Sequence, residues 1–175
     1  HTFSAKSKFF KAACSTHWAE GQTKTVRLPD LDSTVFERYI DWAYTEVLAA
    51  EGTVGEGICA MVKLYLLADV LDDIKLRNKT LMALSSYASI DQTHPGAALI
   101  GYLWDRTASN SALRRWVVDA TILKLDHAVF ERTITQFPAE FVQQVALKLL
   151  QQTPVATTEA FNAKLREHIE VEDNA

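Results

Sequence analysis

The sequence is poor in the residues that build loop-rich or cross-linked scaffolds. Its 175 residues include six glycines, four prolines and two cysteines, against four tryptophans and eight phenylalanines. Cys14 and Cys59 are too few for a disulfide framework, so we expect two buried free thiols, and a single disulfide between them stays open. With 48% hydrophobic residues the chain can bury a sizeable core, and its aromatic-rich, glycine-poor composition favours compact helical packing.

An excess of positive charge and a long apolar run are also missing. The formal net charge is −4, and no basic cluster is interleaved with aromatic residues, which argues against nucleic-acid binding. The longest apolar run, Leu64 to Leu71, is broken by Asp69 and is far too short to span a bilayer. No signal peptide is visible, but the sequence does not begin with methionine, so this absence carries little weight. We expect an intracellular protein of the cytoplasm or nucleus, with no nucleic-acid and no membrane partner.

The region from Lys24 to Leu48 carries the clearest local pattern. Thr25–Leu28 alternates polar and apolar residues, which predicts a short strand. A helix follows, with Asp32 or Thr34 as its N-cap and with Glu37 at capping-box spacing from Thr34. The apolar residues of this helical segment are Val35, Phe36, Tyr39, Ile40, Ala43, Tyr44, Val47 and Leu48.

Two expectations depend on that region. A lone strand leaves backbone groups unpaired, so we expect it to pair with residues 45–55 or with another chain. Trp42 lies off the centre of the helix face expected in the core, where an aromatic side chain either covers a loop or anchors a partner. The face expected in the core comprises Val35, Phe36, Tyr39, Ile40 and Ala43.

The remainder of the chain predicts one helix after another. After a loop at Ala49–Gly57, the segment Ile58–Leu71 is apolar nearly all round and therefore belongs at the centre of the core. Asp126–Arg132 repeats the pattern of Asp32–Arg38, which predicts two helices that begin in the same way. The other helix signals are Asp72-Asp73 at a helix start, Pro95 in a first turn, a cap at Asn110-Ser111, and apolar repeats over 141–149 and 161–169.

Several short segments occur in an order and spacing that resemble a BTB/POZ domain over roughly residues 3–90. They comprise Ser7-Lys8-Phe9-Phe10, Trp18-Ala19-Glu20, Leu28-Pro29-Asp30, Trp42-Ala43-Tyr44-Thr45, Leu66–Leu71 and Leu76-Arg77-Asn78. The segment at Trp18 resembles fungal members. Ser111–Asp119 resembles the helical extension that follows fungal BTB domains, in the place of a BACK-type region.

The resemblance implies an α+β fold that is predominantly helical. A BTB/POZ core would occupy residues 1–92 and a C-terminal helical bundle residues 93–175. Family members carry two strands before their first helix, and these strands are missing here, so the core is expected to be truncated at its N-terminus.

The resemblance also implies a non-enzymatic protein–protein interaction module. Family dimers form largely through the first helix and neighbouring surfaces, so Phe9, Phe10 and Trp18 are expected to mediate self-association and the intact protein to be a homodimer. The alternatives are the BTB part of a transcriptional regulator, and a helical enzyme or ligand-binding domain.

Some family members bind cullin scaffolds as substrate adaptors of ubiquitin ligases. Their contact surface typically carries a hydrophobic residue two positions before an acidic one, and Val54 and Glu56 have this spacing. The alternative for this segment is a solvated loop with an incidental acidic residue. Val54 and Glu56, together with Trp42 as the candidate aromatic anchor on the preceding helix, are the residues expected to bind a partner.

No catalytic, cofactor-binding or metal-binding residues are predicted, and no cofactor is expected. HExxH, CxxC and glycine-rich phosphate motifs do not occur, and the histidines lie far apart. Cys14 and His17 share helical spacing, which we interpret as a buried thiol beside a surface histidine. Cys59 begins a very apolar helix, where a thiol is expected to be inert.

Overall fold

The computed structural model describes residues 32–49, 52–90, 95–124 and 126–153, together with the single positions Ser15, Gln22, Thr23, Thr157 and Thr158. Within these residues every regular element is a helix and no strand is present. The elements in chain order are α4 (Ser33–Thr45), α5 (Val54–Val70), α6 (Ile74–Ile90), α7 (Ala97–Trp104), α8 (Ala112–Lys124), α9 (His127–Thr133), the 3-10 turn η1 (Ile134–Gln136) and α10 (Ala139–Gln152).

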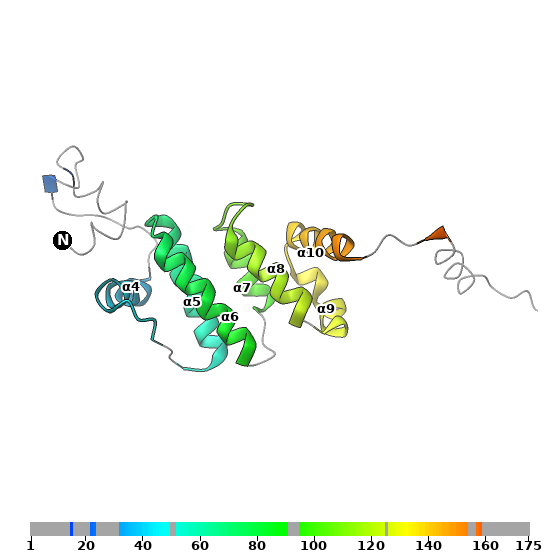
Figure 1. Ribbon diagram of the computed structural model, residues 1–175, viewed down its shortest axis with the longest axis horizontal. Helices are drawn as coiled ribbons and strands as arrows, with labels where there is room; N and C mark the ends of the chain where they lie inside the picture. The colour runs from blue at the N-terminus through cyan, green and yellow to red at the C-terminus, as the bar shows by residue number, and fades with distance from the viewer. Residues whose placement is uncertain are drawn as a thin grey trace, which may run out of the picture.

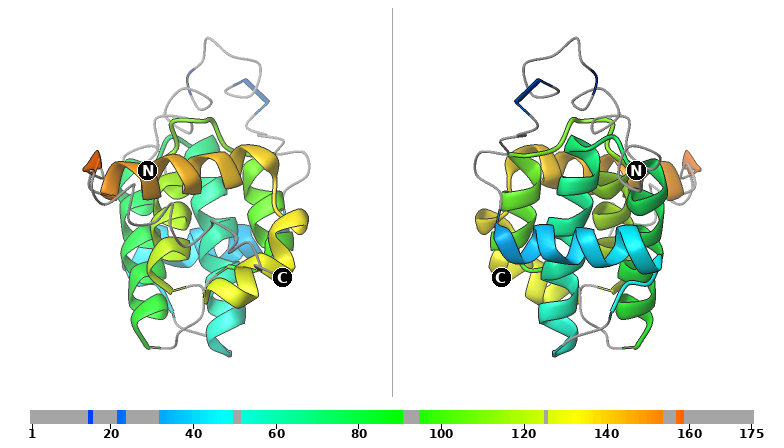
Figure 2. Two further views of the ribbon diagram at one scale, coloured as in Figure 1. Left: turned by 90° about the vertical axis from the view of Figure 1, so that its right-hand side faces the viewer. Right: turned by 90° about the vertical axis from the view of Figure 1, so that its left-hand side faces the viewer.

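The helices stand in a row (Figure 1). α4 lies at one end, followed by α5 with α6, then α7 with α8, then α9 with α10. α5 and α6 share the most extensive contact, α4 packs on α5, and α10 packs on α8. The end helices, α4 and α10, run across the direction of the helices between them (Figure 2). The two ends of the row therefore each present the side of a helix.

α5 is the centre of the core, as its apolar sequence predicts. Helices pack on it from several directions, since it contacts α4, α6 and α7. Its buried side chains include Ile58, Met61, Val62, Leu64, Tyr65, Leu66, Leu67 and Ala68. The helix begins at Val54 rather than at Ile58, so the loop predicted over Ala49–Gly57 is shorter than expected.

Four helices begin where the sequence predicts a helix start, three of them at a predicted cap residue and one at the acidic pair Asp72-Asp73. Asp32 and Asp126 accept hydrogen bonds from the backbone N–H two residues later, at 3.0 and 2.9 Å, so the two similar segments do begin their helices in the same way. Asp73 accepts from Leu76 N at 2.9 Å, and Ser111 Oγ accepts from Leu113 N at 3.2 Å. Each cap supplies an acceptor to a helix N-terminus, whose first N–H groups have no partner within the helix.

Two cap details differ from the prediction. The capping box expected at Thr34 and Glu37 does not form, because the Thr34 hydroxyl donates to Asp32 Oδ1 at 2.7 Å. This bond, the backbone N–H of Thr34 and Lys63 together hold the pKa of Asp32 below its ordinary value. Pro95 lies just ahead of the first turn of α7, where Gly96 is the N-cap.

α4 is rotated relative to the predicted core face. Its buried side chains are Val35, Tyr39, Trp42 and Ala43, which follow the spacing i, i+4, i+7 and i+8 of a single helix face. Phe36 and Ile40, expected in the core, are half-buried, and Trp42 is 0% exposed. The prediction that Trp42 lies off the apolar face was therefore wrong, and an exposed anchor at this position is excluded.

Other expectations fall on residues outside the described ranges. The strand at Thr25–Leu28, the side chains of Phe9, Phe10 and Trp18, and the helix over 161–169 all lie there, so the α+β class stays a prediction. Residues 45–49, 52 and 53 form no strand that could pair with it, and Val54 and Gly55 already belong to α5. The boundary at residues 92 and 93 also stays a prediction, and contacts of α5 with α7 and of α6 with α8 join its two sides.

Two further points concern the surface. Cys59 is exposed, so the expectation of a buried thiol was wrong for this residue, while Cys14 lies outside the described residues.

No helix among the described residues is both long and apolar enough to cross a membrane.

Candidate protein-binding surface

Val54 and Glu56, predicted to bind a partner from a loop, lie in the first turn of α5. Thr53 donates its backbone N–H to Glu56 Oε2 at 2.7 Å and its hydroxyl to the same oxygen at 2.9 Å. Glu56 N donates in return to Thr53 Oγ1 at 3.3 Å, which completes a capping box. The hydrogen bonds from Thr53, that of its backbone N–H first, hold the pKa of Glu56 below its ordinary value. Val54 is half-buried against the core, whereas Glu56 is exposed.

Gly52 fits closely against this cap. Its backbone is left-handed, with φ at +72°, and a Cβ at this position would lie 2.4 Å from Glu56 Oε2. A larger residue would therefore meet both a strained backbone and the capping carboxylate. The start of α5 is thus an ordered structure built from Gly52, Thr53 and Glu56.

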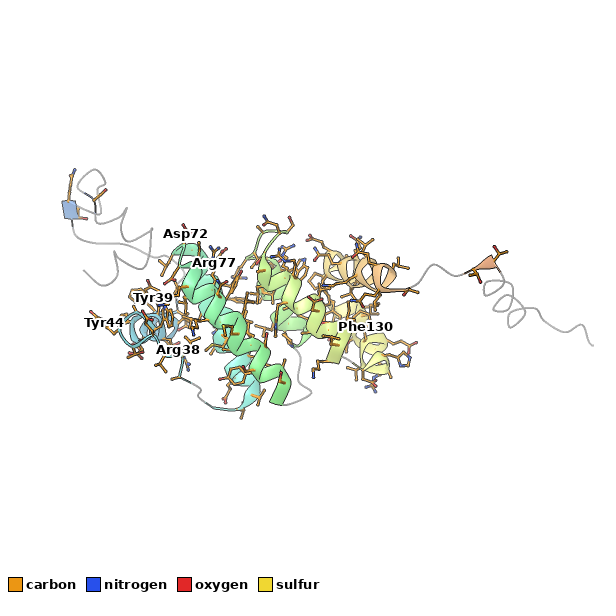
Figure 3. All side chains as sticks on the ribbon, viewed as in Figure 1. Arg38, Tyr39, Tyr44, Asp72, Arg77 and Phe130 are labelled. Carbon is orange, nitrogen blue, oxygen red and sulfur yellow. The ribbon has the colours of Figure 1, made fainter. Side chains whose placement is uncertain are left out.

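A groove of about 330 Å³ lies beside the C-terminal end of α4. Its walls come from α4, from the segment after it and from α5, and its lining residues are Arg38, Asp41, Thr45, Val47, Leu48, Ala49, Met61 and Leu64. Val47 is 64% exposed, and Tyr44 on α4 is 65% exposed. Figure 3 shows Tyr44 on α4 at the outer end of the row. An exposed aromatic residue and an exposed valine near a groove are typical of a protein-binding surface.

The segment after α4 is held in place by its own hydrogen bonds. Glu46 takes a left-handed conformation, with φ at 59°, and its N–H donates to Trp42 O at 2.8 Å. Thr45 Oγ1 donates to Asp41 O at 2.7 Å and accepts from Val47 N at 3.2 Å. Lys75 on α6 pairs with Glu46 at 2.6 Å. The groove is therefore formed before any partner binds, which lowers the entropy cost of binding.

The residues that form this groove lie within a segment that matches a protein family. Residues 2–83 match a BTB/POZ domain. The match covers α4, α5 and the first part of α6, and it supports the BTB/POZ part of the resemblance found in the sequence. The fungal type, the truncated N-terminus and the BACK-like extension stay predictions. BTB/POZ domains are protein–protein interaction modules, and they mediate dimerisation. Comparisons with curated proteins and with solved structures give no match.

A polar network lies beyond the matched BTB/POZ residues and was not predicted. Arg114 on α8 is 6% exposed, and its Nη1 donates to Glu140 Oε2 on α10 at 2.9 Å. Its Nη2 donates to the carbonyls of Trp104 and Thr107 at 2.6 and 2.7 Å, and its Nε donates to Thr107 Oγ1 at 3.0 Å. Arg114 also stacks 4.5 Å from the centre of the Trp104 ring, whose Nε1 donates to Glu140 at 3.0 Å.

This network joins α7, α8 and α10 and has a structural role. Arg114 hydrogen-bonds to groups of the protein itself, and it is nearly excluded from water, so it presents no surface to a substrate. A signal was present in the sequence, since Arg114 lies between Leu113 and the apolar repeat at Trp116 and Val117. Among the described residues, no group of three or more histidine, cysteine or acidic side chains could hold a metal ion.

Proposed function

We propose that this chain is a non-enzymatic protein–protein interaction module of the cytoplasm or nucleus. The observation that carries the proposal is the match of residues 2–83 to a BTB/POZ domain. The groove at the end of α4 supports a partner-binding role for the same residues, because it is preformed and has Tyr44 and Val47 exposed near it. The binding surface comprises the end of α4, the segment 46–49 and the facing side of α5.

A quantitative pull-down tests this surface. Wild type, Tyr44→Glu and Met82→Glu serve as baits, since Met82 is 62% exposed on α6 and is a matched control. Specific partners should be lost with Tyr44→Glu and retained with Met82→Glu. Retention of every partner by both variants would place the binding surface elsewhere.

Self-association is part of the proposal. The intact protein is a homodimer, formed through the region of Phe9, Phe10 and Trp18, which lies within the residues that match the BTB/POZ domain. Light scattering over a concentration series should show a dimer that Phe9→Glu dissociates. A tight dimer unaffected by Phe9→Glu would show that the interface lies in another part of the chain.

The finer proposal is a substrate adaptor that binds a cullin scaffold through Val54 and Glu56. The ordered first turn of α5 supports it, because a cap that forms without a partner requires little further ordering on binding. The half-buried Val54 would supply an apolar contact and Glu56 a charge that orients the partner.

Calorimetry with a cullin N-terminal region tests the adaptor role. The double variant Val54→Asp/Glu56→Lys should abolish binding. Glu56→Gln keeps the capping-box chemistry and removes only the charge, so weakened binding by this variant assigns the effect to the charge and not to loss of the cap. Absence of binding by wild type removes the adaptor proposal and favours the alternative, the BTB part of a transcriptional regulator. Binding that survives the double change places the contact elsewhere.

A further inference from the structure

The connection between α7 and α8 carries a serine with an accessible hydroxyl group. This connection comprises residues 105–111 and lies at one end of the two helices (Figure 1). Ser109 is exposed, and Ser111 N donates to Ala108 O at 2.9 Å, so Ser109 occupies a central position of a four-residue turn. Its hydroxyl makes no hydrogen bond with any of the described residues. The Ser109 oxygen is therefore available for modification.

An arginine three residues earlier gives Ser109 the charge pattern of a kinase target. Arg106 is exposed, its guanidinium lies 4.1 Å from the centre of the Tyr102 ring, and its Nη1 donates to Tyr102 O at 3.3 Å. The positive charge is thus held at the surface. One large group of serine/threonine kinases selects an arginine at this spacing through acidic side chains beside the active site.

The same spacing occurs at two threonines, and the structure separates the first of them clearly from Ser109. Thr80 follows Arg77 by three residues, but it is 0% exposed in α6. Its hydroxyl donates to the carbonyls of Leu76 and Arg77 at 3.1 and 2.8 Å. A kinase cannot reach this oxygen in the folded chain, so Thr80 has the sequence pattern without the access.

The second threonine differs from Ser109 in its backbone. Thr135 follows Arg132 by three residues and is exposed, but the segment from Arg132 to Thr135 lies entirely in α9 and η1. A kinase holds its target as an extended chain, so a helical segment must first unwind, at a cost in free energy. Residues 106–109 lie outside the helices. Ser109 is therefore the one of the three that combines the arginine, the exposure and a non-helical backbone.

We propose that Ser109 is a phosphorylation site for an arginine-directed protein kinase. The Ser109 oxygen attacks the γ-phosphorus of ATP, and the new O–P bond forms as the bond from that phosphorus to the β-phosphate oxygen breaks, which releases ADP. The hydroxyl proton passes to the catalytic aspartate of the kinase. The product carries about −1.5 to −2 additional charges on a chain whose formal net charge is −4.

The surroundings of Ser109 can hold the phosphate. Arg115 on α8 is exposed, and its Nη1 donates to the carbonyl of Asn110, the residue after Ser109, at 2.5 Å. A phosphate next to this carbonyl offers the Arg115 guanidinium charged oxygens in place of a neutral one, and such charge-assisted hydrogen bonds are the stronger kind. Phosphorylation therefore ties the α7–α8 connection to α8 more tightly.

Phosphorylation of the full chain by a purified arginine-directed serine/threonine kinase with MgATP tests the site. Mass spectrometry should locate one phosphate, at Ser109, and Ser109→Ala should abolish its incorporation. Arg106→Ala should lower kcat/KM at least tenfold, whereas Arg132→Ala, the matched control at Thr135, should leave it unchanged. The folded chain should react within about tenfold of the kcat/KM of a peptide that covers residues 104–114.

Thermal unfolding tests how the phosphate is held. Phosphorylation of wild type should raise the melting temperature by about 2–4 °C, and Arg115→Ala should remove this gain. Because Ser109 and Arg106 are exposed, Ser109→Ala and Arg106→Ala should keep the unfolding curve of wild type, which separates loss of modification from loss of the fold.

Every other outcome contradicts the proposal. Absence of phosphate, phosphate at Thr80 or Thr135 in place of Ser109, or a rate that Arg106→Ala leaves unchanged would show that this connection is not an arginine-directed site. A folded chain that reacts more than a hundredfold more slowly than the peptide would show that the turn is closed to kinases. A gain in melting temperature that survives Arg115→Ala would assign the phosphate to another partner.

Discussion

The two halves of the described chain are held together by different forces. Around α5 the packing is apolar, and two of the ion pairs there lie at the surface: the side chains that join Lys75 to Glu46 and Lys63 to Asp32 are 42–57% exposed. In the C-terminal half, the Arg114 side chain is 7% exposed and joins three helices. A surface pair contributes about 0–1 kcal/mol, whereas a buried arginine must have its hydrogen bonds satisfied. The stability of the first half therefore depends on the burial of apolar side chains. The stability of the second half also depends on a polar network whose hydrogen bonds require a fixed arrangement of Arg114 and its partners.

The largest effect is expected in the apolar half. Trp42→Ala should lower the free energy of unfolding by about 3–5 kcal/mol, because it removes a fully buried side chain and leaves a cavity. Tyr44→Ala, two residues along the same helix, should change it by about 0.5 kcal/mol or less, because Tyr44 faces solvent. Urea denaturation measures both, and similar losses would contradict the observed rotation of α4.

A second pair of variants compares the centre of the same core with its edge. Leu67→Ala should cost about 2–5 kcal/mol, since Leu67 is 5% exposed at the centre of α5. Phe36→Ala should cost less than Leu67→Ala, because Phe36 is half-buried at the edge of the core. The same denaturation experiment decides the order, and a larger loss for Phe36→Ala would show that it lies deeper than the structure places it.

In the C-terminal half, removal of Arg114 should lower the free energy of unfolding. Arg114→Ala should cost about 2–3 kcal/mol, because it leaves the Trp104 and Thr107 carbonyls without their partner. This expected loss of unfolding free energy is smaller than the ~3–5 kcal/mol typical of breaking a fully buried ion pair, because Glu140 is half-exposed.

Lys75→Ala is the matched change in the first half. It removes the exposed pair with Glu46 and should cost about 1 kcal/mol or less. Arg114→Lys keeps the charge but loses the planar fork, so it should remain destabilised. Equal losses for Arg114→Ala and Lys75→Ala in thermal unfolding would remove the contrast between the two halves.

A smaller effect is expected where Gly57 on α5 faces the Tyr87 ring on α6. A Cβ at Gly57 would lie 2.6 Å from the Tyr87 ring, so Gly57→Ala should cost about 1–3 kcal/mol by overpacking. Gly55, two residues earlier, has open space around it, and Gly55→Ala should stabilise the helix by about 0.5–1 kcal/mol. Adding Tyr87→Ala to Gly57→Ala should give less than the sum of the two losses, and additive losses would show that the ring is not the obstacle.

The smallest effect is the pH dependence of the cap at the start of α5. Because the pKa of Glu56 is lowered in the folded protein, its contribution is complete above the ordinary value near 4.5 and is lost as the pH falls through the folded pKa. The melting temperature of wild type should therefore fall more than that of Glu56→Gln as the pH decreases below 4.5. Parallel curves for the two proteins would contradict a role for the ionised carboxylate.

Features that depend on neighbouring residues in the chain could be predicted from sequence. Asp32, Asp73, Ser111 and Asp126 cap helices through N–H groups two or three residues later, so each cap is visible in a short segment. The central position of α5 was equally accessible, because a segment that is apolar all round can be stable only in a core.

Features that depend on residues far apart in the chain could not be predicted from the sequence. The rotation of α4 is set by what α5 presents to it, and Phe36 and Trp42 are equally apolar in the sequence. Arg114 and Glu140 are 26 residues apart, and no local pattern joins them. At the candidate site, the partner-binding role of Val54 and Glu56 stays a prediction. The sequence pattern predicted a loop for these residues, whereas they lie in a helix cap, and the exposure of Tyr44 was not predicted.

The exposed thiol of Cys59 affects how self-association must be measured. Cys59 lies on α5, within the residues that match the BTB/POZ domain, and its side chain is open to oxidants. Air oxidation can therefore link two chains through this sulfur into a covalent pair of the same mass as a native dimer. Light scattering should be carried out under reductant and repeated with Cys59→Ser, so that a pair that persists in both reflects association rather than oxidation.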